Sequence, residues 1–260
     1  MGELDGKVAI ITGGGYGIGK EIALIYARAG AKLVLSGRTP GPLEETRAAM
    51  EKIGPGAIAV RTDVAREADC VQMVEAAVKA FGRVDILVNN AGIAGPTKLT
   101  TDMALAEWQE VIDINLTGAW LASRAAIPLM VKQKAGNILM ISSGAGRRGY
   151  PFRSPYAASK WAMIGLTQTL AGEWGGHGIR VNCICPGAVE GDRIERVIKA
   201  RAEAMNAPYE QVKRNFTATA AMQRMVTEEE VARVSLFLVS DLSAGVTGQT
   251  INVDAGGIMN

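Results

Sequence analysis

Residues 7–19 read KVAIITGGGYGIG, an apolar run rich in β-branched residues that leads directly into a cluster of glycines. The run predicts a buried strand, and the helical spacing of Ile18, Ile22, Ile25 and Tyr26 predicts a helix after it. Glycines at such a junction let the backbone approach a pyrophosphate, and the N-terminal N–H groups of the helix favour an anion. The stretch therefore predicts a phosphate site at the first strand-to-helix turn. A tight turn without a ligand is the alternative.

Short β-branched runs continue to alternate with longer amphipathic segments along the chain, as parallel βαβ units do. Strands are predicted at 7–12, 32–36, 57–61, 84–89, 137–142, 180–184 and 250–253. Helices are predicted at 67–81, 108–132 and 227–240, with Pro128 bending or dividing the second of them. The sequence has no linker or repeat. We therefore expect one doubly wound (Rossmann-like) three-layer α/β domain over residues 1–260, with a parallel seven-stranded sheet.

Residues 190–225 depart from this alternation. They are rich in charge and alanine, with a helix predicted over Ile194–Met205. An insertion here lies beyond the carboxyl ends of the strands, where open α/β sheets bind ligands. We interpret it as a substrate loop that acts as a mobile lid; an ordinary helical excursion without ligand contact is the alternative.

Composition narrows the classes of function. Hydrophobic residues make up 48% of the 260 residues, and a formal net charge of +2 gives no reason to expect nucleic acid or an anionic membrane as a partner. No apolar run is long enough to span a bilayer, and the acidic start of the chain lacks the features of a signal peptide. We expect a cytoplasmic protein whose partner is a small molecule.

The cysteines and the histidine argue against several kinds of site. Cys70, Cys183 and Cys185 are odd in number and form no CxxC motif, so neither a disulfide framework nor a metal site is expected. Cys183 and Cys185 are predicted to share one side of a buried strand as small apolar residues. His177 is the sole histidine and lies in a glycine-rich turn, where we expect it to be solvated. A mechanism based on a histidine base is therefore disfavoured.

Tyr156 and Lys160 are one helical turn apart in the stretch YAASK. Residues at i and i+4 share a helix face, so the ammonium can lie beneath the phenol ring. Lowering the phenol pKa from about 10 by about three units requires roughly 4 kcal/mol. One unit charge about 4 Å away supplies an amount of that order at an effective dielectric of about 20. The pair can thus produce a tyrosine that exchanges protons near neutral pH.

Ordered motifs link these features to a known family. TGxxxGxG at 12–19, Asn89-Asn90-Ala91-Gly92, Asn115, Ser143 and YxxxK at 156–160 follow one another at characteristic separations. Together they resemble the single-domain form of the short-chain dehydrogenase/reductase family, over a match from Lys7 to the C-terminal VTGQTINVDAGG. The resemblance implies an NAD(P)(H)-dependent oxidoreductase that interconverts a secondary alcohol and a ketone. It also implies a homotetramer joined through two long helices and the last strand, with which the apolar tail Gly256–Met259 is consistent.

The resemblance implies four catalytic residues. Tyr156 would be the general acid/base, and Lys160 would lower its pKa and hold the nicotinamide ribose. Ser143 would orient and polarise the substrate carbonyl, while its neighbour Ser142 is expected to be structural. Asn115 would anchor a water that links Lys160 to solvent. A helix-bending amide bonded to backbone is the alternative interpretation of Asn115, and both can hold.

The resemblance also implies the contacts of the cofactor. Besides Tyr156 and Lys160, these would be Gly13, Gly17, Ile18 and Gly19 at the pyrophosphate, Asp63 and Val64 at the adenine, Asn90, Ala91 and Gly92 at the adenosine ribose, and Pro186 and Gly187 at the nicotinamide. The Asn89–Gly92 motif could otherwise be mainly a structural lock for the central sheet, which is compatible with a secondary binding role.

The end of the second predicted strand, Ser36-Gly37-Arg38, bears on the choice of nucleotide. A carboxylate there would bind the ribose 2′-hydroxyl and repel a 2′-phosphate, and none is present. Arg38 can pair with the phosphate and stack on adenine, which favours NADP(H). Tyr16 stands where NADP-preferring relatives often carry a second basic residue, and Arg38 could simply stack on the adenine of NAD(H). NAD(H) therefore remains the alternative.

Arginines gather around the predicted active site. Arg147, Arg148 and Arg153 lie between Ser143 and Tyr156, and Arg193 and Arg196 follow Pro186-Gly187. Such a wall suits a carboxylate-bearing substrate, such as a hydroxy or keto acid derived from a sugar, with Arg148, Arg153 and Arg193 as the contacts. Ion pairs with Glu190, Asp192 or a neighbouring subunit are the alternative.

Two other functions compete. One is reduction of a 3-oxoacyl thioester, which would require a basic patch for a carrier protein or coenzyme. The other is a non-catalytic protein that senses the redox state of the nucleotide. Such proteins typically lose the tyrosine or the lysine, and this chain keeps both Tyr156 and Lys160.

Overall fold

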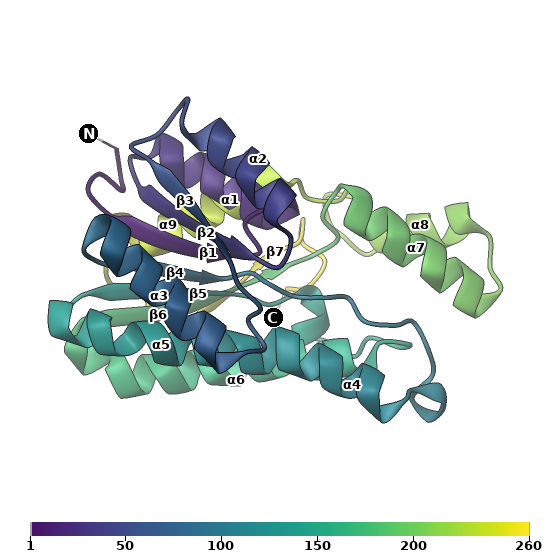
Figure 1. The fold of residues 1–260 in the computed structure, drawn as a ribbon. Helices are drawn as coiled ribbons and strands as arrows, with labels where there is room; N and C mark the ends of the chain where they lie inside the picture. The colour runs from purple at the N-terminus through teal and green to yellow at the C-terminus, as the bar shows by residue number, and fades with distance from the viewer. Residues whose placement is uncertain (1, 260) are drawn as a thin grey trace.

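A computed structural model describes residues 2–259. Within them, seven parallel strands form one sheet in the order β3-β2-β1-β4-β5-β6-β7 (Figure 1). The strands are β1 (Val8–Thr12), β2 (Lys32–Gly37), β3 (Ala57–Arg61), β4 (Ile86–Asn89), β5 (Gly136–Ile141), β6 (Ile179–Pro186) and β7 (Thr250–Val253). The predicted doubly wound parallel sheet is confirmed. The strand order reverses between β1 and β4, and a crevice for a ligand forms at such a switch point.

Helices cover both faces of the sheet (Figure 1). One face carries α1 (Gly17–Arg28), α2 (Pro40–Met50) and α9 (Glu228–Val239). The other carries α3 (Glu67–Phe81), α5 (Gly118–Gln133) and α6 (Ser154–Trp174). None of the helices between residues 2 and 259 combines the length and apolar character needed to cross a bilayer.

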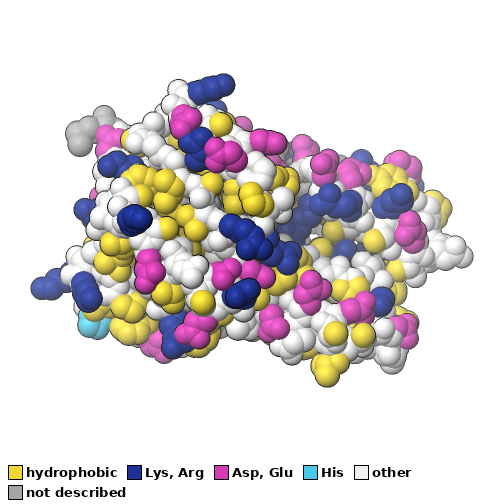
Figure 2. Space-filling model, in the orientation of Figure 1, with side chains coloured by type: hydrophobic (Ala, Val, Ile, Leu, Met, Phe, Trp, Pro, Cys, Tyr) yellow, Lys and Arg dark blue, Asp and Glu magenta, His cyan; other side chains and the backbone are white. Residues whose placement is uncertain are grey.

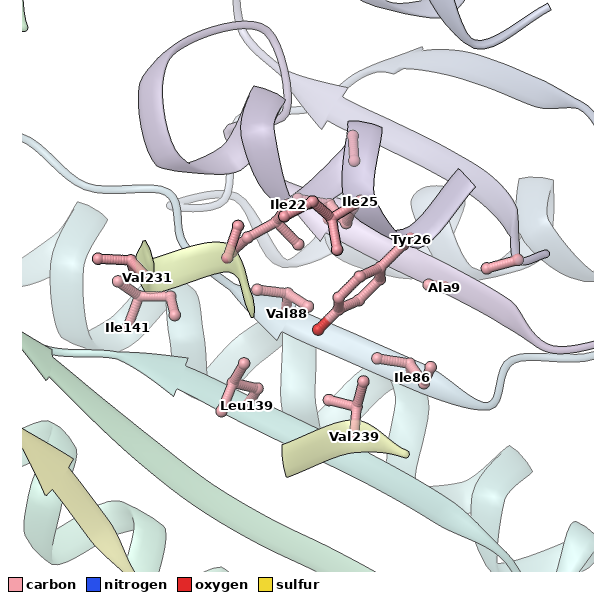
Figure 3. Close-up of a cluster of buried hydrophobic side chains, with 14 of the residues drawn as sticks. Ala9, Ile22, Ile25, Tyr26, Ile86, Val88, Leu139, Ile141, Val231 and Val239 are labelled. Carbon is pink, nitrogen blue, oxygen red and sulfur yellow. The ribbon is translucent and has the colours of Figure 1, made fainter. Parts of the chain in front are cut away.

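The central strands β1, β2, β4, β5 and β6 are buried on both faces, and alternate residues enter two separate cores. Ala9 and Ile11 of β1 face α1 and α9, whereas Ile10 between them faces the other layer. Figure 3 shows the first core, where Tyr26 of α1 lays its ring over the sheet beside Ala9. Cys183 and Cys185 both belong to the second core, so their predicted shared side is confirmed. The continuous apolar runs of the sequence are explained by this two-sided burial.

The predicted helix over 108–132 is divided, but not at Pro128. α4 (Leu105–Ile112) passes through one π-helical turn, Asp113–Thr117, into α5. Pro128 lies inside α5, which continues through it. The prediction that Pro128 divides the helix was therefore wrong, whereas the alternative that it bends the helix stays a prediction. A π-turn is a known cause of irregularity in a helix, and here it contains Asn115.

The segment after β6 projects from the body as α7 (Asp192–Met205) and α8 (Tyr209–Thr217) (Figure 1). Its two ends are joined by a parallel bridge between Val189 and Val226, which closes the base of the excursion. The two helices share a small apolar core of Ile198, Ala202, Val212 and Met225. α7 fits the predicted helix, whereas α8 and α2 were not predicted. α8 is strongly polar with Val212 as its one buried residue, and α2 begins with a Pro-Gly-Pro run that is typical of a turn.

Candidate active site

A cavity of about 780 Å³ opens at the carboxyl ends of the central strands. It brings together nearly all of the residues that the sequence predicted for catalysis, cofactor and substrate. They are Gly13, Gly17, Ile18, Arg38, Asp63, Val64, Asn90, Ala91, Gly92, Ser143, Arg148, Arg153, Tyr156, Lys160, Pro186, Gly187 and Arg193. Gly19 and Asn115 lie behind this lining. A volume of this size is typical of small-molecule and cofactor sites.

The glycine loop between β1 and α1 requires its glycines for two different reasons. Gly13 has φ +68° and Gly17 has φ +54°, which side chains rarely adopt. Gly19 instead lies so close to the Gly13 carbonyl and the Asn90 amide that a Cβ would collide with both. The loop is anchored because the Gly13 amide donates to the Ser36 carbonyl over 2.7 Å. This bare backbone beside a helix N-terminus fits a pyrophosphate.

The Asn89–Gly92 motif locks β4 to β1. Thr12 Oγ1 accepts the amides of Asn90 (2.9 Å) and Ala91 (3.0 Å) and donates to the Val88 carbonyl (3.1 Å). Asn90 Nδ2 donates in turn to the Thr12 carbonyl at 2.9 Å. The structural role considered from the sequence is thus present. Asn90, Ala91 and Gly92 also line the cavity, and their predicted role in cofactor binding stays a prediction.

Asn115 joins the segment after β4 to α6. Its Oδ1 accepts the Ile93 amide at 2.8 Å, and its Nδ2 donates to the Ile93 carbonyl at 3.0 Å and to Ser159 Oγ at 3.1 Å. Asn115 is therefore a fully buried amide bonded to backbone within a π-turn, as the alternative interpretation anticipated. Its role in anchoring a water stays a prediction.

α6 places the tyrosine and the lysine together. The helix begins at Ser154, with Pro155 in its first turn, where a missing N–H has no cost. Lys160 is 3% exposed, and its Nζ lies 5.9 Å from the centroid of the Tyr156 ring. Lys160 Nζ also donates to the Ile141 carbonyl at 2.7 Å, and Ser142 Oγ donates to the Lys160 carbonyl at 2.7 Å. Ser142 thus makes a structural contact, as expected.

Several groups act on the acidity of Tyr156. Burial of the phenol raises its pKa, but the nearby cations of Arg193 and Lys160, a hydrogen bond with Ser143 and the cation of Arg153 together outweigh burial. The net result is a pKa below the ordinary value of a tyrosine. Burial lowers the pKa of Lys160, an effect that the neighbouring Tyr156 opposes. The phenol is therefore prepared to give up its proton at lower pH than tyrosine in water.

Sequence reasoning anticipated the effect of Lys160 on Tyr156 but missed that of Arg193. YxxxK fixes a local helical geometry, whereas Arg193 reaches the site only because α7 folds back over the cavity. Arg193 Nη1 donates to the Gly92 carbonyl at 3.2 Å, which links the start of α7 to the loop after β4. No periodicity in the sequence could have indicated that contact.

The arginines of the predicted wall differ in their surroundings. Arg148 is exposed at the edge of the cavity. Arg153 is 5% exposed, and its Nη1 donates to the Ala94 carbonyl at 3.1 Å. Neither these two nor Arg193 forms an ion pair with Glu190, Asp192 or any other acidic residue within 2–259. The alternative of pairing with a neighbouring subunit stays a prediction. Figure 2 shows Lys and Arg side chains gathered along the hollow between the body and the projecting α7 and α8.

Other residues of the cavity were missed. Tyr150 lines it, and the Arg201 guanidinium lies 5.3 Å from the centroid of the Tyr150 ring. Ile258 of the C-terminal tail also lines it, held by a 2.9 Å hydrogen bond from Asn252 Nδ2 to the Ile258 carbonyl. Tyr150 was detectable as a member of the stretch between Ser143 and Tyr156. The return of the tail had no sequence signal.

Comparisons with known proteins agree with this geometry. A family model described as enoyl-(acyl carrier protein) reductase matches residues 13–257. A 3-oxoacyl-[acyl-carrier-protein] reductase of Synechocystis sp. is 38% identical over 261 residues, covering 100% of both chains. An uncharacterized oxidoreductase of Thermotoga maritima is 38% identical over 251 residues, covering 96% of this chain and 97% of that protein. The crystal structure of an NAD⁺-bound xylitol dehydrogenase matches with a TM-score of 0.95 at 31% identity, covering 97% of this chain and 99% of that one.

The fold, the cavity and these relatives define an oxidoreductase that acts on alcohol and ketone groups with a nicotinamide cofactor. The chain belongs to the short-chain dehydrogenase/reductase family.

Proposed function

We propose that Tyr156 is the general acid/base of a reversible secondary alcohol dehydrogenase. The observation that carries this proposal is the environment of its hydroxyl, which bonds Ser143 and lies near Lys160, Arg193 and Arg153, so that the pKa of the phenol is lowered despite burial. A bound nicotinamide would accept or supply the hydride at its C4 position. In the direction of oxidation, the Tyr156 phenolate takes the hydroxyl proton of the substrate. In the direction of reduction, the phenol returns a proton to the carbonyl oxygen.

The other site residues prepare this proton transfer. Ser143 Oγ accepts the Ala145 amide at 3.1 Å, which fixes the serine as the cap of a short turn beside Tyr156. From there its hydroxyl can donate to the substrate oxygen and polarise a carbonyl. Lys160 favours the phenolate and would hold the nicotinamide ribose. Asn115 would hold a water through which the proton reaches solvent.

NADP(H) is the nucleotide we favour. Arg38 is exposed at the end of β2, lines the cavity and forms no ion pair within residues 2–259. Its guanidinium is therefore available to a 2′-phosphate, and the end of β2 carries no carboxylate to repel that group. NAD(H) is the alternative, supported by the NAD⁺ bound to the similar xylitol dehydrogenase.

The substrate we propose is a small hydroxy or keto compound that enters beneath α7 and α8. These helices have their own apolar core and are attached to the body at the bridge between Val189 and Val226. The excursion at 190–225 can therefore move as one unit within a single catalytic domain. That arrangement suits a lid which excludes water before hydride transfer.

Reduction of a 3-oxoacyl thioester is a second candidate function, because two of the similar proteins carry that name. Such a substrate is neutral at the reacting carbonyl. Arg153 and Arg193 place two cations near Tyr156, which a thioester would not neutralise. Reduction of acetoacetyl-coenzyme A at a higher kcat/KM than every free ketone or keto acid would favour this second function.

A cytoplasmic homotetramer is the assembly we propose. Trp120 of α5 is 42% exposed and Trp161 of α6 is 50% exposed. Large aromatic side chains on two long neighbouring helices suit an interface between copies. Sedimentation equilibrium of the purified protein tests the tetramer, and a monomer at micromolar concentration would exclude it.

The test of the proposed reaction is a panel of secondary alcohols and ketones with both nucleotides, followed by nicotinamide absorbance. We expect Tyr156→Phe to lose turnover while its affinity for the dinucleotide is retained. Tyr209→Phe is the matched control, because it removes a partly buried phenol on α8 that donates to Glu195 outside the cavity, and it should retain turnover. Near-normal activity of Tyr156→Phe would refute the mechanism.

A further inference from the structure

We propose that Arg153 and Arg193 form a carboxylate-binding subsite beside Tyr156, so that the substrate is a hydroxy acid in one direction and a keto acid in the other. This inference rests on the proposed function, since it assigns the part of the substrate that does not react. The sequence suggested Arg148, Arg153 and Arg193 as substrate contacts without separating their roles. The structure distinguishes them by burial and by contact.

Arg153 is a buried cation that forms no ion pair with any acidic residue in the described part of the chain, 2–259. Its side chain is 5% exposed, and its one hydrogen bond goes to the Ala94 carbonyl. Burial lowers its pKa, and the charged or phenolic groups around it are Tyr150, Tyr156, Arg193 and Arg201. Burying a charge is unfavourable unless it is paired and hydrogen-bonded. An anionic ligand would supply the missing charge.

The position of Arg153 is fixed with respect to Tyr156. It directly precedes α6, whose first turn contains the tyrosine. The preceding residue, Phe152, has φ +68°, and its carbonyl accepts the Lys98 amide at 2.9 Å. A left-handed phenylalanine is uncommon, and such strain is retained where the surroundings require one conformation. The backbone separation of Arg153 and Tyr156 is therefore set by one short segment, whereas Arg193 comes from α7.

Arg193 completes the subsite from the opposite side. It belongs to the first turn of α7 and crosses the cavity to the Gly92 carbonyl. A guanidinium has five N–H donors, and this contact uses one of them. The remaining donors of Arg193 and Arg153 can bind the two oxygens of a carboxylate. A substrate acid would thereby connect α7 to the body of the protein.

Within residues 2–259, no acidic side chain occupies this place as an ion-pair partner. Besides Asp63, the acidic residues in the cavity lining are Glu190, Asp192, Glu228 and Asp254, and none pairs with Arg153 or Arg193. The phosphates of the nucleotide belong to the Gly13–Gly19 loop and, for a 2′-phosphate, to Arg38. The two arginines instead act on Tyr156, where the substrate reacts.

The experiment measures binding of keto compounds to the full-length protein saturated with oxidised nucleotide, a complex in which a ketone cannot be reduced. Pyruvate, acetoacetate and 4-oxopentanoate are titrated calorimetrically against their methyl esters. We expect at least one acid to bind about tenfold or more tightly than its ester, the size typical of hydrogen bonds to a charged group. In Arg193→Met and in Arg153→Met that preference should fall to about twofold or less.

Lys199→Met is the control for net charge. It removes a cation from the same helix α7, at a depression shared with Asn206 and Tyr209 and separate from the cavity, and should keep the acid preference. If Arg153→Met melts at a lower temperature than the wild-type protein, the acid preference of Arg193→Met decides the result, because Arg193 is exposed.

2-Oxopropanesulfonate and 2-oxopropylphosphonate test the kind of anion, and tighter binding of either than of acetoacetate would overturn the carboxylate assignment.

Failure of this inference is distinct from failure of the proposed function. Equal binding of the acids and their esters by the wild-type protein overturns the subsite, even if neutral ketones are reduced rapidly. Absence of turnover with every alcohol and ketone contradicts the dehydrogenase, whereas an acid preference that depends on Arg193 would still stand. Loss of the preference in Lys199→Met as well would mean that net charge, not the arginine pair, causes it.

Discussion

Lys160 holds two parts of the site at once: its Nζ lies 5.9 Å from the centroid of the Tyr156 ring and 2.7 Å from the carbonyl oxygen of Ile141. Ser142, next in sequence to Ile141, donates its hydroxyl to the Lys160 carbonyl at 2.7 Å. The end of β5 and the second turn of α6 are therefore joined by reciprocal hydrogen bonds. Ser143 directly follows Ser142 in the sequence, and Tyr156 lies one helical turn before Lys160. The hydrogen bonds between Ser142, Ile141 and Lys160 therefore bring Ser143 close to Tyr156.

The pH dependence of oxidation should reveal the contribution of Arg193 to this site. Oxidation needs the Tyr156 phenolate, so its rate rises with pH through the pKa of that group. Arg193 helps to lower that pKa, and Arg193→Met should therefore move the pH profile to higher pH. A neutral secondary alcohol is the substrate of choice, because an acid would also report on binding. Lys199→Met should leave the midpoint in place, and an unchanged midpoint in Arg193→Met would show that its charge does not reach the phenol.

Asn115 should contribute to stability as well as to activity. Removal of its amide in Asn115→Ala leaves the amide and carbonyl of the partly buried Ile93 without these partners and costs about 1–3 kcal/mol of unfolding free energy. Denaturant unfolding with linear extrapolation measures the loss. The control is Gln211→Ala, which changes an exposed residue of α8. Asn182→Ala is unsuitable as a control because Asn182 is also buried. A loss within about 0.5 kcal/mol, as for a surface substitution, would contradict the role.

Much of the fold and of the catalytic site was predictable because both depend on local patterns. The β-branched and apolar runs predicted the bounds of β3 at 57–61 and of β7 at 250–253 to the residue, although both are partly exposed edge strands. Tyr156 and Lys160 share a helix face whatever surrounds them. The glycines of 13–19 are required by φ angles and close approach, which leave a direct trace in residue choice.

The parts that were not predictable depend on contacts between distant segments. Arg193 meets Gly92 only after α7 has folded over the cavity, and Ile258 enters the lining only because the tail turns back. The division of the 108–132 helix was assigned to Pro128 from propensity, yet it occurs at Asn115, whose side chain bonds Ile93 and Ser159. Tertiary hydrogen bonding determined that break, and helix propensity did not.

Arg38 should govern the choice between the two nucleotides. Replacing it in Arg38→Asp removes the cation and introduces a carboxylate where one would bind a ribose 2′-hydroxyl and repel a 2′-phosphate. We expect the ratio of kcat/KM for NADP(H) to that for NAD(H) to fall by about 100-fold or more, which corresponds to roughly 3 kcal/mol. Steady-state kinetics with one substrate and both nucleotides measures the ratio. Arg148→Asp, at the substrate end of the cavity, controls for the change of charge. An unaltered ratio in Arg38→Asp would mean that Arg38 does not contact the 2′ position.

The carboxylate of Glu230 should contribute to the acid dependence of stability, because it both pairs with Arg224 and caps α9. Its Oε1 accepts Arg224 Nη2 at 2.6 Å, and its Oε2 accepts the Thr227 amide at 2.8 Å. In return Thr227 Oγ1 accepts the Glu230 amide at 3.2 Å, a capping box at the point where the chain returns from the α7–α8 excursion. The Arg224 bonds, followed by the Thr227 amide, lower the pKa of Glu230 from 4.5 to about 2.

The sign of the effect follows from that depressed pKa. The unfolded chain takes up the proton near pH 4.5 and the folded chain only near pH 2, so the stabilisation is complete above 4.5 and disappears as the pH falls toward 2. Glu230→Gln should therefore be less stable than wild type at neutral pH, and the difference should close between pH 4.5 and 2. Denaturant unfolding at several pH values across this window measures it. Glu229→Gln, whose partner is the exposed Arg233, lacks the bond to the backbone and should show a smaller difference at neutral pH. A gap between Glu230→Gln and wild type that persists unchanged down to pH 2 would show that the carboxylate charge is not what stabilises the start of α9.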